Sequence, residues 1–224
     1  MTWITRIRNK NLKAGFSQYD EDSIILNIFE EIKTTNKFYV DIGALGYGAL
    51  MSNTLCLHNE NWKGLAFDMD EDPNNRTIKE FITPFNILEI LKKYNCPKEF
   101  DFLSIDIDSF DYDVLEEIFS EYQPRVICTE YNATLDPNST IKMKYKEGYV
   151  WDKTNNYGYS YGAGKYLLEK NGYKVILNQD DTNLFAIKSD LIDFDVHVEV
   201  NQNIYHSVNE NAEWIDCKEP IKKD

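Results

Sequence analysis

Residues that build thiol or imidazole chemistry are scarce in this chain of 224 residues, which contains four cysteines and three histidines. Cys56, Cys96, Cys128 and Cys217 lie far apart with no Cys-x-x-Cys pair, and three of them lie in or beside apolar stretches. We expect reduced, mostly buried thiols in a reducing compartment, and no zinc site built on them. None of the histidines lies at metal-ligand spacing from another, which disfavours a histidine-rich metal site and a Ser-His-Asp hydrolase.

Positive charge is scarce as well. Lysine and arginine number 24 against 38 aspartates and glutamates, so the formal net charge is −14. This excess of negative charge repels nucleic acid and anionic lipid. No apolar run approaches the roughly 20 residues of a membrane-spanning helix, and the first residues lack the apolar core of a signal peptide. We expect a cytoplasmic protein that binds a small molecule, with no nucleic-acid or membrane partner; assembly into a homo-oligomer stays open.

The chain does contain short apolar runs that alternate with amphipathic stretches of about ten residues, a pattern typical of a parallel sheet covered by helices. It predicts strands at residues 38–42, 65–68, 81–83, 102–107, 126–130, 173–177 and 184–187. It predicts helices at residues 23–32, 52–59, 87–94, 112–119 and 161–170. We therefore expect an α/β fold with helices on both faces of the sheet, in one domain over residues 1–190.

Two segments depart from this rhythm. From Asn132 to Gly158 no periodic element is clear over about 27 residues, which is long for a connection. The aromatic content of residues 132–161 favours a lid insertion over a disordered excursion. Apolar and polar residues then alternate strictly from Ile192 to Val200, which predicts a strand exposed on one face. We expect residues 191–224 to form this C-terminal strand and a tail that packs on the same domain.

A glycine-rich turn follows the first predicted strand, in FYVDIGALGYGALMSNT at residues 38–54. Glycines such as Gly43 allow a sharp turn and a close approach to a ligand, and the helix beyond offers unpaired N–H groups. Asp41 at the strand end would repel a pyrophosphate, so a cationic ligand fits better. Asp68 ends the next strand, where its carboxylate can accept both hydrogens of a ribose diol. A plain strand-to-helix turn is the alternative.

Acidic and amide side chains follow the fourth and fifth predicted strands. They are Asp106, Asp108, Asp111, Asp113, Glu130 and Asn132. Because adjacent parallel strands end at the same edge, we expect Asp106, Glu130 and Asn132 to lie together. Carboxylate oxygens suit Mg²⁺, which makes Asp106, Asp108 and Glu130 candidate metal ligands. The alternative is structural: Asp111 caps the next helix, Asp113 lies in its first turn, and Asp106 accepts backbone hydrogen bonds.

The predicted lid mixes lysines with aromatic residues. Aromatic faces stack on sugars and lysine binds phosphate, so Lys144, Tyr149, Trp151 and Tyr159 are candidate contacts to a sugar or a nucleotide-linked sugar. A solvated lysine edge beside a packing cluster is an equal alternative.

On these segments the chain resembles class I S-adenosylmethionine-dependent methyltransferases, and more narrowly the FkbM-related group. The resemblance covers most of residues 15–190. It rests on SQYDED at 17–22, VDIGALGYG at 40–48, SNT at 52–54, NWKGLAFD at 61–68, FLSIDIDSFDYDVLEEI at 102–118 and PRVICTEYN at 124–132. It implies a Rossmann-like fold with a seven-stranded mixed sheet whose last strand is antiparallel.

The resemblance also implies roles for individual residues. The cofactor-binding residues would be Asp41, Gly43, Ala44, Asn53, Asp68 and Asp106. Of these, Asp68 would hold the ribose, with Asp70 as a competing carboxylate, and Asp106 would lie near the sulfonium. The sequence departs from the family pattern at Leu45, where a polar residue is common, and at Asp68, where Glu is more frequent.

The predicted reaction is methyl transfer from S-adenosylmethionine to a hydroxyl of a small molecule, a sugar or nucleotide-linked sugar of a surface polysaccharide. Asp106, Glu130 and Asn132 are the expected catalytic residues, with a carboxylate as general base or a bound Mg²⁺ lowering the pKa of the hydroxyl. Two alternatives come from other classes. A nicotinamide-dependent oxidoreductase shares the fold but needs a pyrophosphate fingerprint that this chain lacks. A non-catalytic binding module of the same fold would not need the acidic and glycine positions.

Overall fold

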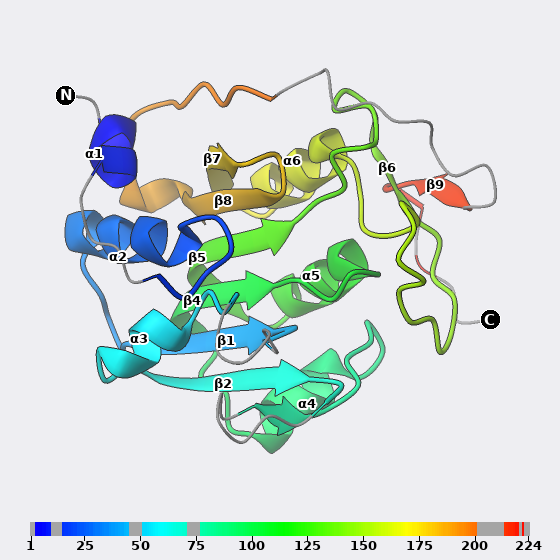
Figure 1. Cartoon of the computed structure of the whole chain (residues 1–224), viewed down its shortest axis with the longest axis horizontal. Coiled ribbons are helices and arrows are strands. Elements are labelled where there is room, and N and C mark those ends of the chain that lie inside the picture. The colour runs from blue at the N-terminus through cyan, green and yellow to red at the C-terminus, as the bar shows by residue number, and fades with distance from the viewer. Residues whose placement is uncertain are drawn as a thin grey trace.

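The computed structural model describes residues 3–9, 15–44, 51–70, 77–200, 213–219 and 221. Seven strands form one sheet in the order β3-β2-β1-β4-β5-β8-β7 (Figure 1). They are β1 (Phe38–Ile42), β2 (Lys63–Asp68), β3 (Ile78–Lys79), β4 (Glu99–Ile105), β5 (Gln123–Glu130), β7 (Tyr173–Gln179) and β8 (Asn183–Lys188). Neighbours from β3 to β5 pair in parallel, and β8 is antiparallel to both β5 and β7. The predicted seven-stranded mixed sheet is confirmed.

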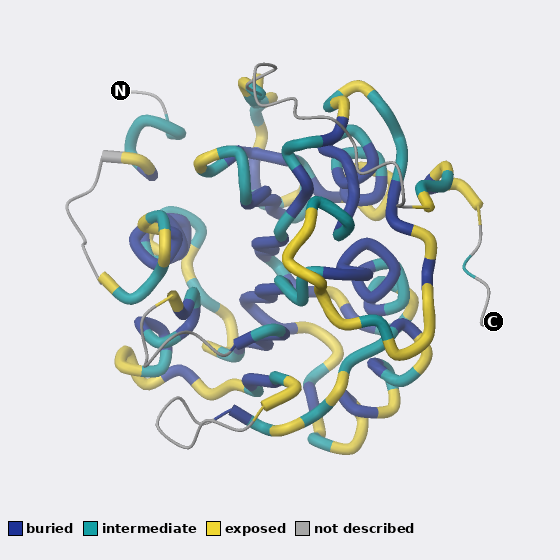
Figure 2. The backbone as a smooth tube through the Cα atoms, turned by 45° about the vertical axis from the view of Figure 1, so that its right-hand side comes forward, coloured by how far each residue is buried: buried dark blue, intermediate teal, exposed yellow. Residues whose placement is uncertain are grey.

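Helices cover both faces of this sheet. The helices α1 (Trp3–Asn9), α2 (Glu21–Ile32) and α3 (Leu55–Asn59) contribute to one apolar cluster, and α4 (Ile87–Lys93), α5 (Asp111–Phe119) and α6 (Tyr161–Lys170) contribute to the other. In β1, Tyr39 packs in the first cluster, whereas Val40 and Ile42 pack in the second. Because both faces are covered, the strands need apolar residues at successive positions, as the apolar runs of the sequence indicated. Figure 2 shows the buried centre that results.

The third predicted strand is misplaced in the sequence analysis. The structure places β3 at Ile78 and Lys79, which pair with Phe67 and Asp68 of β2. Residues 81–83 lie beyond this short edge strand, and the side chain of Phe81 is 44% exposed. The short apolar run at residues 81–83 therefore lines a cavity and forms no strand. A run this short has no periodicity that would distinguish a buried strand from an apolar cavity wall.

Residues 192–200 form no strand ladder, contrary to the prediction. Their burial does alternate, with Ile192, Phe194 and Val196 packed against the α1–α2 side of the core. The carbonyl of Phe194 accepts a hydrogen bond from Lys174 Nζ at 3.0 Å. Alternation thus reported correctly which side chains are covered, but it does not report whether the main chain pairs with a neighbour.

The segment 132–161 crosses the side of the molecule toward which β1, β2, β4 and β5 point (Figure 1). It contains β6 (Ile141–Met143), which pairs in antiparallel fashion with β9 (Trp214–Asp216) near the C-terminus. A further bridge joins Lys142 to Tyr159 within the segment. The segment is therefore built into the fold. No helix in the described part of the chain has the length and apolar character that a membrane span requires.

Candidate functional site

A cavity of about 670 Å³ opens at the carboxyl ends of four neighbouring strands. Gly43 after β1, Asp68 in β2, Asp106 after β4 and Glu130 in β5 all line it. Residues of the 132–161 segment line it as well. Sheets of this type bind ligands at this edge, where the strand order reverses.

The turn after β1 is fixed by close contacts with both neighbouring strands. The N–H groups of Gly43 and Ala44 donate to the carbonyl of Phe67, at 2.9 and 3.0 Å. On the other side, Asp106 N–H donates to the carbonyl of Ile42 at 2.9 Å. Gly43 has φ +86 and lines the cavity, whereas Ala44 is buried outside the cavity lining. Gly46 and Gly48 lie outside the described residues.

Two predicted cofactor residues have protein partners and do not line the cavity. Asp41 is buried, and its carboxylate accepts a hydrogen bond from the Thr54 hydroxyl at 2.5 Å. Burial raises the pKa of Asp41 to about 6, because desolvation disfavours the charged form. The side-chain amide of Asn53 donates to Ser104 Oγ at 3.2 Å. Both side chains therefore hydrogen-bond to other residues of the protein and are not free to contact a ligand in the cavity.

Asp68 does line the cavity, at the end of β2. Its Oδ1 accepts the N–H of Asp70 at 3.0 Å, which fixes the carboxylate on the turn. Asp70 lines the same cavity, but it is exposed and lies 4.0 Å from Lys79 Nζ. Apolar side chains line the same cavity, among them Phe67, Phe81, Ile82 and Ile107. A carboxylate in one cavity with apolar side chains suits a ribose joined to a flat base.

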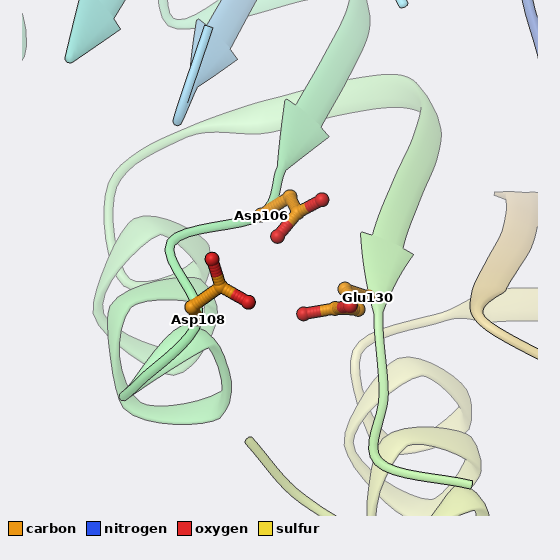
Figure 3. Close-up of side chains that lie close together, drawn as sticks. All are labelled: Asp106, Asp108 and Glu130. Carbon is orange, nitrogen blue, oxygen red and sulfur yellow. The ribbon is translucent and has the colours of Figure 1, made fainter. Parts of the chain in front are cut away.

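Three carboxylates converge on the other part of the cavity (Figure 3). Oxygens of Asp106, Asp108 and Glu130 lie within 4.8 Å of one another. The parallel register of β4 and β5 pairs Ile105 with Thr129, which brings the following residues, Asp106 and Glu130, side by side. The sequence analysis therefore identified this triplet correctly as a set of neighbours.

The charged forms of this triplet, Asp106, Asp108 and Glu130, are disfavoured by burial and by mutual repulsion. Burial raises the pKa values of Asp106 and Glu130 above their usual range, and repulsion between the carboxylates raises them further. Burial also raises the pKa of Asp108. Glu130 Oε2 is buried with no hydrogen-bond partner in the described structure. Such an arrangement calls for a shared proton or a bound cation.

The other acidic and amide candidates hold the surroundings in place. Asp111 accepts the N–H groups of Ile107 and Ser109 at 2.8 and 3.1 Å, which shapes the loop that carries Asp108. Burial raises the pKa of Asp111 to about 6. Asn132 is fully buried outside the cavity lining, and its amide donates to the carbonyls of residues 155 and 157, both at 2.9 Å. Asn132 therefore does not line the cavity with the two carboxylates that it was predicted to join.

The lid candidates divide in a similar way. Tyr149 and Trp151 line the cavity. Lys144 does not; its ammonium group pairs with Glu213 at 2.6 Å. Tyr159 is fully buried in the core, so it cannot contact a ligand in the cavity.

Two lysines that line the cavity were missed by sequence reasoning, Lys146 and Lys153. Lys146 shares the alternating pattern of Lys142 and Lys144. Because β6 ends at Met143, the alternation no longer predicts which side a later side chain faces. Lys153 carries no local sequence signal. Gln18, in the SQYDED motif, also lines the cavity.

No protein-family model and no curated protein matches this chain. Among solved structures, the N-terminal domain of EvdMO1 with SAH bound has a TM-score of 0.45 and 12% identity, over 77% of this chain and 82% of that chain. A candidate O-methyltransferase from Klebsiella pneumoniae has a TM-score of 0.44 and 13% identity, over 83% and 87%. A candidate S-adenosylmethionine-dependent methyltransferase from Listeria monocytogenes has a TM-score of 0.41 and 13% identity, over 75% and 97%. At these values the similarity is remote, and it does not by itself indicate a function for this chain.

Proposed function

We propose that this protein is an S-adenosylmethionine-dependent O-methyltransferase whose acceptor is a sugar or nucleotide-linked sugar used for a surface polysaccharide. One observation carries the proposal: a single cavity contains the Asp68 carboxylate, apolar side chains and the Asp106, Asp108 and Glu130 carboxylates. A nucleoside site and a site for proton removal would then lie within reach of one ligand pair. The motifs that resemble the FkbM-related group support the same proposal.

The residues that line the cavity fit the cofactor. Asp68 would accept hydrogen bonds from both ribose hydroxyls, while Phe81, Ile82 and Ile107 would flank the adenine. The negative charge around Asp106 favours a positively charged sulfur over a phosphate. When bound, the cofactor supplies an electrophilic methyl group on that sulfur. The protein would position the two reactants, and positioning accounts for much of the acceleration in reactions of this kind.

The acceptor hydroxyl must lose its proton as the methyl group arrives. Its pKa lies far above 7, so a base within hydrogen-bond reach is needed. Asp106 and Glu130 line the cavity, and because burial raises their pKa values, whichever of them is ionised is a stronger base than an exposed carboxylate. We assign proton removal to this pair, with Asp106 as the main catalytic residue.

A divalent cation such as Mg²⁺ fits the same carboxylates. Asp106, Asp108 and Glu130 would hold it, and the unpartnered Glu130 Oε2 is an oxygen available for such a bond. When bound, the ion would supply positive charge beside the acceptor and lower the pKa of its hydroxyl. The carboxylates then act as ligands and orienting groups in place of a free base.

Calorimetry with S-adenosylmethionine and S-adenosylhomocysteine tests the proposal. Both compounds should bind the wild-type protein, and Asp68→Ala should weaken binding by about 1 to 3 kcal/mol, the scale of lost charge-assisted hydrogen bonds. Asp70→Ala is the matched control, because Asp70 lines the same cavity but is exposed. It should change affinity by no more than a few fold. Absence of binding by both compounds, or binding of a nicotinamide dinucleotide in their place, would overturn the proposal.

A further inference from the structure

The cavity has charge of opposite sign in two places. Six of its lining residues are acidic and two are basic. The acidic residues belong to the strand ends and the loops that follow them: Asp68, Asp70, Glu80, Asp106, Asp108 and Glu130. The basic residues, Lys146 and Lys153, both belong to the 132–161 segment. In a chain with a net charge of −14, two basic side chains that line the same cavity from one segment are a feature to explain.

These two lysines differ from the other lysines of the segment. Lys142 is buried in an ion pair with Asp113, and Lys144 pairs with Glu213. Neither of them lines the cavity. For Lys146 and Lys153, no carboxylate of the described residues lies within ion-pair distance. Both side chains are exposed and can therefore bind an anion without first breaking a salt bridge.

Exposed apolar side chains also line the cavity. Six large hydrophobic residues of the described chain are exposed, and five of them line the cavity: Met51, Met69, Phe81, Val150 and Trp151. Val150 and Trp151 lie between the two lysines in sequence. The indole N–H of Trp151 donates to the carbonyl of Thr154 at 2.8 Å, which fixes the ring while 38% of the residue stays exposed. A fixed, exposed ring that lines the same cavity as two lysines suits a sugar ring that carries a phosphate.

We propose that the acceptor is a phosphate-bearing sugar, and that Lys146 and Lys153 bind its phosphate while Trp151 contacts its ring. The inference rests on the proposed methyl transfer, because it specifies the acceptor of that reaction. The opposite charges of the cavity then orient the acceptor. The phosphate is held at the lysines and repelled by the acidic triplet, so a hydroxyl of the sugar is left to face Asp106 and Glu130.

Calorimetry with four probes tests this inference on protein saturated with S-adenosylhomocysteine: glucose 1-phosphate, glucuronic acid, methyl glucoside and inorganic pyrophosphate. EDTA is present throughout, so that a bridging metal ion cannot hold the phosphate at the acidic triplet. Glucose 1-phosphate should bind best, and the double variant Lys146→Ala, Lys153→Ala should weaken its binding by about tenfold or more. Lys144→Ala, a neighbouring lysine outside the cavity, should leave binding within about twofold. Binding of inorganic pyrophosphate should be weakened in the double variant but unchanged in Trp151→Ala.

Three results would overturn the inference. One is equal binding of glucose 1-phosphate to the wild type and the double variant, including no binding to either. Another is an equal loss in Lys144→Ala, which would indicate a general effect of surface charge. The third is tighter binding of glucuronic acid, which would assign a carboxylate in place of the phosphate. Binding of S-adenosylhomocysteine is measured first and separately, so a failure of the proposed function is distinguished from a failure of this inference.

Discussion

The carbonyl oxygen of Asp106 occupies the space in which a side chain at Gly43 would lie. An ideal Cβ at Gly43 would be 1.6 Å from that oxygen. The turn after β1 and the loop that carries the proposed catalytic carboxylate are therefore in direct backbone contact. Because the Asp106 N–H also donates to Ile42, the two segments form one rigid unit at the floor of the cavity.

Substitution of Gly43 by alanine should destabilise the protein strongly. The new methyl group would clash with the Asp106 carbonyl, and φ +86 is unfavourable for any residue with a Cβ. Gly172→Ala is the matched control, because Gly172 has φ +85 and a Cβ at that position would meet nothing within 4 Å. We expect Gly43→Ala to lower the free energy of unfolding by at least about 2 kcal/mol more than Gly172→Ala does. Urea denaturation of both variants measures this difference, and equal losses would contradict it.

Replacement of Asp106 by asparagine should reduce turnover while leaving cofactor affinity nearly intact. General-base catalysis contributes about 10²- to 10⁴-fold, so a loss of roughly 10²-fold or more is expected with an acceptor that supports turnover. Binding of S-adenosylhomocysteine should stay within a few fold, and Asp70→Asn serves as the control for charge in the cavity. Normal turnover in both Asp106→Asn and Glu130→Gln would place proton removal elsewhere.

Mg²⁺ should stabilise the folded protein if the triplet binds it. A ligand present at 10 to 100 times its dissociation constant raises the free energy of unfolding by about 1 to 3 kcal/mol. We expect Asp108→Asn to abolish most of the increase and Asp70→Asn to retain it, measured as the shift of the melting temperature with MgCl₂. EDTA should then lower the methylation rate. Undiminished activity in EDTA, with no shift by MgCl₂, would leave the carboxylates as base and orienting groups.

The buried carboxylate of Asp41 should make stability depend on pH. Its pKa rises from 3.8 to about 6 in the folded state, so the folded protein binds more protons than the unfolded chain between these values. The contribution of Asp41 to the free energy of unfolding is then fully present below about pH 4 and is lost as the pH rises through 6. Asp41→Asn keeps an acceptor for the Thr54 hydroxyl and should flatten this fall, by up to about 3 kcal/mol at 1.4 kcal/mol per pKa unit. Unfolding of both proteins between pH 4 and 7 tests this, and parallel pH profiles would refute it.

Two neighbouring lysines of the lid should differ sharply in their effect on stability. Lys142 and Asp113 are each 1% exposed, whereas the side chains of Lys144 and Glu213 are 46% and 74% exposed. Lys142→Met leaves a buried carboxylate unpaired and should cost about 3 to 5 kcal/mol. Lys144→Met breaks an exposed pair and should cost at most about 1 kcal/mol.

Proteolysis provides a second readout for the same pair. Cleavage within residues 132–161 should be faster in Lys142→Met than in Lys144→Met, since the buried pair joins β6 to α5. The double variant Lys142→Met, Asp113→Leu should recover part of the stability, because no buried charge remains. Similar cleavage and stability in all of these variants would show that the buried pair does not anchor the lid.

Local pattern in the sequence was sufficient to predict six of the seven strands and the neighbours at the carboxyl edge of the sheet. Apolar runs separated by amphipathic stretches predict strands covered on both faces, and parallel strands end at one edge. For that reason Asp106 and Glu130 were predicted to be neighbours, and Asp68 was predicted to reach the same region. These inferences depend on residue pattern and on strand direction, which the sequence carries.

Which lid residues reach the cavity depends instead on contacts made in the folded chain. Lys144 and Lys146 are chemically equivalent in the sequence, but Glu213 from the distant C-terminal segment pairs with Lys144, while Lys146 lines the cavity. Asn132 and Tyr159 are likewise held by buried hydrogen bonds, with the chain near residues 155–157 and with Thr129. A loop side chain takes its direction from contacts with segments far away in sequence, and local periodicity does not encode such contacts.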